Sequence, residues 1–214
     1  MKLDLSNVTA ICIDGRPVDP ARQANYQTIL KYMLSCVTFG KIKMISLEDP
    51  IVDGVEFIQT EPLTIQEYSQ FCINKLHSYV DTEFCLVFQD DGFILNPELW
   101  SADFLKYDYI GAPWPLYIGW PTVGSQVGNG GFSLRSKRLL EFTKNLNCTL
   151  NEDVLMAVVY KNEIAEAGLT IAPVELATRF AVEIPMDSNH VPTNTFGFHA
   201  KNLAEEAFKI INNK

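Results

Sequence analysis

A short apolar run that ends in two acidic residues constrains the fold of this chain more than any other feature. The run Phe84–Phe88 is apolar throughout, and Gln89 then leads into Asp90 and Asp91 before a glycine and a second apolar stretch. Its length and composition are typical of a buried strand. Ligands of open α/β sheets gather at the carboxyl ends of strands, and hard divalent cations prefer oxygen ligands. The pattern therefore predicts a metal site at the end of this strand.

The same acidic pair also fits an ordinary turn, because Asp and Gly are both favoured in turns. Two features favour the metal site. The flanking residues are strongly apolar, so the two carboxylates would lie at a largely buried edge. Adjacent carboxylates also raise each other's pKa unless a cation relieves the repulsion.

Composition and net charge favour a single globular domain and argue against a nucleic-acid-binding protein. The 214 residues are 47% hydrophobic and 20% charged, which is typical of one globular domain spanning residues 1–214. The net charge of −9 argues against nucleic acid as a partner, although a metal ion would still allow a nucleoside diphosphate to bind. We expect no transmembrane segment and no signal peptide. The five scattered cysteines form no Cys-x-x-Cys pair, which favours reduced thiols in a cytoplasmic protein.

Strand and helix patterns alternate in the first half of the chain. Expected strands are 8–13, 41–47, 55–58 and 84–88, with helices beginning at Pro20 and at Thr64, where Glu67 completes a capping box. This order predicts an α/β fold whose mostly parallel central sheet is flanked by helices on both faces. The second half is more irregular, with expected helices at 97–106, 137–144, 152–162 and from 201, and expected strands at 108–112, 131–136 and 170–172.

Three further segments contain candidate site residues, and each has a simpler structural explanation. The glycine-rich loop around Asn129, Gly130 and Gly131 would let a sugar or phosphate approach the backbone, but it also fits a hairpin loop. Either Glu152 or Asp153 would suit a general base, although acids in a first helical turn also complement the helix dipole. His199 lies between aromatic residues, where a lone histidine is more often structural than a ligand.

Taken in order, these segments resemble the nucleotide-sugar glycosyltransferases of the GT-A fold, and most of all a poorly characterised bacterial and viral group. The matching pieces are Gln89–Asp91, Tyr109–Trp114, Gly128–Ser136, Glu152–Asp153, Ala177–Glu183 and Phe196–His199. They cover roughly residues 84–200. The resemblance implies a GT-A-like, Rossmann-like domain with a donor-binding half at about 1–96 and an acceptor-side half at about 97–214.

The resemblance also implies roles for individual residues. Gln89 and Asp91, with the late histidine His199, would hold Mn²⁺ or Mg²⁺ on the donor diphosphate; Gln89 departs from the first acid of the usual Asp-x-Asp motif. Asp153 would be the general base, with Glu152 beside it. The residues expected to contact the donor or acceptor are Asp14, Arg16, Asp90, Trp114, Asn129, Gly130 and Gly131. Trp114 could stack on a sugar, but a buried position in the core suits it at least as well.

The activity implied is transfer of a sugar, hexosyltransferase-like and inverting, from a nucleotide-sugar donor to a hydroxyl of a glycan or another acceptor. A UDP-sugar is the favoured donor. Gln89 also favours a different function, a catalytically silent module that binds nucleotide sugars or glycans. A nucleotidyltransferase or metal-dependent phosphohydrolase is a third possibility, because paired acids at strand ends serve those reactions too.

Overall fold

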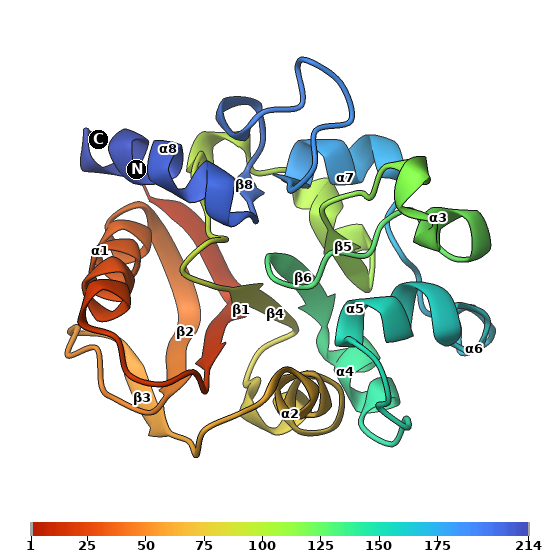
Figure 1. Ribbon diagram of the computed structural model, residues 1–214, viewed down its shortest axis with the longest axis horizontal. Coiled ribbons are helices and arrows are strands. Elements are labelled where there is room, and N and C mark those ends of the chain that lie inside the picture. Colours follow the sequence, from red (N-terminus) through yellow and green to blue (C-terminus); the bar gives the residue numbers. More distant parts are fainter. Residues whose placement is uncertain (1, 214) are drawn as a thin grey trace.

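A six-stranded sheet runs through the middle of the protein, as a computed structural model describes it for residues 2–213, apart from the side chain of Pro121 (Figure 1). The strand order is β3-β2-β1-β4-β6-β5. The strands are β1 (Leu3–Asp14), β2 (Val37–Ser46), β3 (Glu56–Gln59), β4 (Phe84–Phe88), β5 (Tyr109–Gly111) and β6 (Ser133–Ser136). Only β6 runs antiparallel to its neighbours among these six. The expected mostly parallel α/β sheet is confirmed.

Helices cover both faces of the sheet, which explains why its central strands are continuous apolar runs. On one face, α1 (Pro20–Cys36) and the C-terminal α8 (Lys201–Asn212) share an apolar cluster with β1 and β4. On the other face, α2 (Ile65–Gln70) leads into a π-helical turn, Phe71–Lys75, which packs with α4 (Lys137–Thr143). The predicted capping box is present at the start of α2, where Glu67 N donates to the Thr64 hydroxyl.

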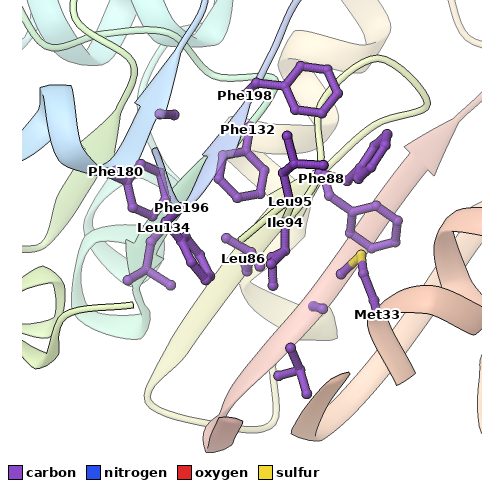
Figure 2. Packing of buried hydrophobic residues seen from close by; sticks show 14 of the residues in the cluster. Met33, Leu86, Phe88, Ile94, Leu95, Phe132, Leu134, Phe180, Phe196 and Phe198 are labelled. Atoms are coloured by element: carbon purple, nitrogen blue, oxygen red, sulfur yellow. The ribbon is translucent and has the colours of Figure 1, made fainter. Parts of the chain in front are cut away.

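A cluster of buried phenylalanines packs the C-terminal part of the chain, including Phe180, Phe196 and Phe198, against the central sheet (Figure 2). Phe132, just before β6, stacks on Phe180 at a centroid distance of 5.1 Å. Phe180 ends α7 (Val174–Phe180), after which β7 (Ala181–Val182) pairs in parallel with β8 (Gly197–Phe198). This small two-stranded sheet ends immediately before His199, so aromatic packing holds that residue at the edge of the central sheet.

Several expected elements are shorter or more irregular than predicted. The helix expected at 97–106 is two 3₁₀ segments, Pro97–Leu99 and Ala102–Lys106, because Trp100 is extended and Ser101 caps the second segment. The helix expected at 152–162 is α5 (Glu152–Val154), a π-helical segment (Leu155–Val159) and then α6 (Lys161–Glu166). The strand expected at 170–172 is a single bridge between Tyr109 and Ile171. The remaining short elements are α3 (Trp120–Val123) and the 3₁₀ segments Leu76–Tyr79, Leu116–Ile118 and Pro192–Asn194.

Candidate active site

A cleft of about 270 Å³ lies at the carboxyl ends of β1 and β4. It is lined by residues 13–16, 63–65, 68–69, 89, 131, 151–153 and 199. Both halves of the chain, before and after residue 97, therefore contribute to it. Its place at the strand ends is where ligands of open α/β sheets gather.

The three residues expected to hold a cation lie together, and two of them, Gln89 and His199, line this cleft. Gln89 Oε1 is 3.1 Å from His199 Nε2, and Asp91 Oδ1 is 3.6 Å from the same nitrogen. Ligands about 2.1 Å from an octahedral ion are about 3 Å apart, so these donor atoms are spaced as neighbouring ligands would be. Across residues 2–213, no three His, Cys, Asp or Glu side chains are grouped to hold a metal. The amide of Gln89 is the third donor that the geometry supplies.

His199 is surrounded by acceptors and amides. Its backbone N–H donates to Val182, and its Nδ1 is 3.6 Å from Glu183 Oε1 and 3.0 Å from Asn129 Nδ2. Burial lowers the pKa of the imidazole, but the contact with Glu183 and the charge of Asp91 outweigh burial and raise the pKa above its usual value. Sequence reasoning gave Glu183 no role.

Asp153 has the environment of a general base. Its Oδ2 accepts from the Gly130 N–H at 3.3 Å and its Oδ1 from the Val154 N–H at 2.7 Å. Burial, with the nearby charge of Glu152, raises the pKa of Asp153 to about 7. A carboxyl group with this pKa exchanges a proton near neutral pH.

Glu152 lies beside Asp153, but its carboxylate faces the interior. Its Oε1 accepts from Arg135 at 3.3 Å, and its Oε2 accepts from the Ser69 hydroxyl at 3.4 Å. Arg135 is completely buried and also donates to the Gly130 carbonyl. Glu152 is thus placed to position the loop and Asp153. The available signal was an arginine within an expected strand that has no other charged residue, because a buried guanidinium requires a carboxylate partner.

An ionic network joins the ends of β1 and β4, and two of its members, Asp14 and Arg16, line the cleft. Arg16 donates to Asp14 at 2.8 Å and to Asp90 at 2.7 Å, and Arg22 donates to Asp14 at 2.8 Å. Burial alone would raise the pKa of Asp14, but its hydrogen bonds with Arg16 lower it. The structure therefore brings Asp14, Arg16 and Asp90 together, and Arg22 is a member of the network that sequence reasoning missed.

The glycine-rich loop packs closely, and Trp114 lies away from the cleft. A Cβ atom built on Gly131 would be 2.1 Å from His199 Nε2, so only glycine fits there. Trp114 is buried against Val154 and Ala157, and a Cβ on Gly128 would be 2.1 Å from its indole ring. With 5% of its surface exposed, Trp114 is a packing residue, which agrees with the core alternative and not with contact to a donor or acceptor.

The fold is of the α/β class, with a mostly parallel six-stranded sheet flanked by helices. A crystal structure of a glycosyltransferase involved in glycosylation of the major capsid of PBCV-1 is similar in fold, with a TM-score of 0.56, 13% identity, and coverage of 97% of this chain and 99% of that chain. The glycosyltransferase GlyE of Streptococcus pneumoniae has a TM-score of 0.47 and 11% identity, and the match covers 97% of this chain and 60% of that chain.

The sequence comparison defines the family. The pattern of the protein family of unknown function DUF5672 matches residues 54–199. The chain therefore belongs to DUF5672. The comparison with curated proteins gives no match. Among residues 2–213, no helix is long and apolar enough to cross a membrane.

Proposed function

We propose that this protein is a metal-dependent, inverting glycosyltransferase that moves a sugar from a nucleotide-sugar donor, with a UDP-sugar favoured, to a hydroxyl of a glycan or another acceptor. One observation supports this most directly: Asp153, with its pKa raised to about 7, lines the same cleft as Gln89 and His199. A base and a cation-binding group are thus available to one substrate. The fold shared with a glycosyltransferase is consistent with this activity.

In this proposal Asp153 takes the proton from the acceptor hydroxyl as that oxygen attacks the anomeric carbon. The base must be ionised to act, and a pKa near the working pH favours both ionisation and proton transfer. The Gly130 and Val154 N–H groups hold the carboxylate in place. The ion pair of Glu152 with Arg135 holds the Gly130 loop in place, and neither side chain accepts the proton of the acceptor hydroxyl in this proposal.

The residues Gln89, Asp91 and His199 would hold Mn²⁺ or Mg²⁺, which when bound neutralises charge on the leaving diphosphate. Asp14, Arg16 and Asp90 would lie nearer the nucleoside, and Gly130 and Gly131 nearer the sugar. In this scheme residues 1–96 mainly bind the donor and residues 97–214 the acceptor. All five cysteines are free thiols, which supports a cytoplasmic location.

One observation favours the alternative of a silent nucleotide-sugar or glycan-binding module. Gln89 donates to the Tyr68 hydroxyl at 2.9 Å and lies 3.1 Å from His199, so protein groups alone satisfy both ends of its amide. Such a site has less need of a cation than one built from two carboxylates. Binding of a nucleotide sugar without turnover would support this alternative.

Turnover of a nucleotide sugar separates the transferase from the binding module, and removal of the metal tests whether turnover depends on it. The protein is incubated with a panel of UDP-, GDP- and CMP-sugars, and release of the nucleotide is measured with Mn²⁺, with Mg²⁺ and with EDTA. We expect turnover with Mn²⁺, its loss in EDTA and its recovery when excess Mn²⁺ is added, because the leaving diphosphate needs the cation. The Asp153→Asn variant serves as the inactive control. Turnover that persists in EDTA contradicts metal dependence.

A further inference from the structure

The two-stranded sheet formed by β7 and β8 ends in two residues that face each other. The parallel register pairs Val182 with Phe198, which are the last residues of the two strands. Glu183 and His199 follow immediately after them and therefore lie side by side. The ring nitrogen Nδ1 of His199 is 3.6 Å from Glu183 Oε1. The backbone therefore brings a carboxylate to the Nδ1 edge of this imidazole, while the Nε2 edge faces Gln89 and Asp91.

Gln89 Oε1 and Asp91 Oδ1 are acceptors beside Nε2, so a cation held there would leave the proton of a neutral imidazole on Nδ1. The groups around Nδ1 then decide how well that proton is held. An ionised carboxylate can only accept, so Glu183 favours a proton on Nδ1. Asn129 adapts to either state, because rotating its amide exchanges donor and acceptor. Its Nδ2 faces Nδ1 at 3.0 Å, while its buried Oδ1 has no partner among the described residues. Glu183 is thus the partner whose chemistry is fixed.

A proton on Nδ1 leaves the lone pair of a neutral imidazole on Nε2. That lone pair then points to the space shared with Gln89 Oε1 and Asp91 Oδ1, at 3.1 Å and 3.6 Å. Histidines that bind metals generally donate their other ring N–H to a carboxylate or carbonyl, which fixes the ring and makes the ligand more basic. The arrangement around His199 has the same components.

We propose that Glu183 is a positioning residue for the cation site: its carboxylate, 3.6 Å from Nδ1 of His199, favours the ring tautomer with the proton on Nδ1 and so leaves Nε2 to the cation. This inference depends on the proposed metal-dependent function. Glu183 touches neither the cation nor the substrate, and it acts through the ring of His199. Its place one residue beyond β7 makes the small two-stranded sheet part of the site.

The test measures Mn²⁺ binding without any substrate. The affinity is obtained from the free Mn²⁺ signal in electron paramagnetic resonance, and electron spin echo modulation reports a coordinated ring nitrogen. We expect Glu183→Leu to weaken Mn²⁺ binding by about 10- to 100-fold, which is the usual loss when such a partner is removed. Glu183→Gln retains an acceptor and should recover part of the affinity.

Two controls make the result specific. Glu175→Leu removes an exposed carboxylate of α7 that has no contact with His199, and its affinity should equal that of the wild type. His199→Leu should lose the ring-nitrogen signal. The melting temperature of each variant without metal shows whether a loss of affinity comes from unfolding.

The outcomes separate the inference from the proposed function. If Glu183→Leu binds Mn²⁺ as tightly as Glu175→Leu while His199→Leu binds weakly, the role of Glu183 is wrong and the metal site stands. If the wild-type protein binds no Mn²⁺, or shows no ring-nitrogen coupling, the metal site of the proposed function fails and the role of Glu183 fails with it.

Discussion

Replacing Asp153 by asparagine should lower the rate of sugar transfer by about 10²- to 10⁴-fold, the usual contribution of a general base. Asparagine keeps the shape of the side chain and an oxygen for the Gly130 and Val154 N–H groups, but it takes up no proton. The rate is measured at saturating donor and acceptor. Donor binding should change little, since Asp153 acts on the acceptor.

The pH dependence follows from the raised pKa of Asp153, about 7. The wild-type rate should rise with pH up to about 7 and then level off, because the ionised form is the base. The residual rate of Asp153→Asn should lack this step. A wild-type profile that is flat from pH 5 to pH 9 would show that another group, or none, takes the proton.

The contribution of Asp153 to the free energy of unfolding should fall with rising pH, whereas the transfer rate rises. The native pKa of Asp153 lies above that of an unfolded aspartate, so its contribution to stability is full below the unfolded pKa and is lost as pH rises through 7. Asp153→Asn avoids this loss. We expect the variant to melt at the same or a higher temperature than the wild type at pH 8, so reduced activity would not be an effect of unfolding.

Replacing Arg135 by methionine should lower the free energy of unfolding by about 3–5 kcal/mol, because it leaves the Glu152 carboxylate buried without its partner. Arg135 is completely buried and is 3.3 Å from Glu152, and it also donates to the Gly130 carbonyl. Urea denaturation measures the loss. If the variant is too unstable to purify, Arg135→Lys retains the charge and gives a smaller loss.

The double variant Arg135→Met with Glu152→Leu tests whether the loss of stability comes from the unpaired Glu152 carboxylate. Removing both charges avoids the unpaired carboxylate, so the double variant should be more stable than Arg135→Met alone and closer to the wild type. Losses that simply add would mean that the two side chains are not coupled. The transfer rate of the double variant should still fall, since Asp153 would lose the neighbours that position it.

Sequence patterns predicted the elements that depend on local chemistry. The apolar run Phe84–Phe88 is a strand with the expected bounds, and the Thr64–Glu67 capping box begins a helix. The helix that begins at Pro20 is also present, with Asp19 as its N-cap. In each case the signal lies within a few residues of the element, so one sequence is enough to recognise it.

The predictions from sequence fail where contacts between residues far apart in the sequence determine the local structure. The helix expected at 152–162 is interrupted by the π-helical segment Leu155–Val159, where the Ala157 carbonyl accepts from the N–H of Ser125, a residue far away in the sequence. The sequence left Trp114 open between sugar contact and the core, because its burial against Val154 and Ala157 depends on packing across the fold. The pairing of Arg135 with Glu152, and of Glu183 with His199, joins residues that only the folded sheet brings together. Their roles could not be assigned from spacing.

The ionic network at the end of β1 has a consequence for how a ligand would be attracted. Asp14 and Asp90 already offset Arg16 and Arg22 through contacts of 2.7–2.8 Å, so this side of the cleft offers a nucleoside almost no net field. Selection there would rest on shape and on hydrogen bonds, and ionic strength would alter it little. Long-range attraction of a phosphate would then depend on a bound cation.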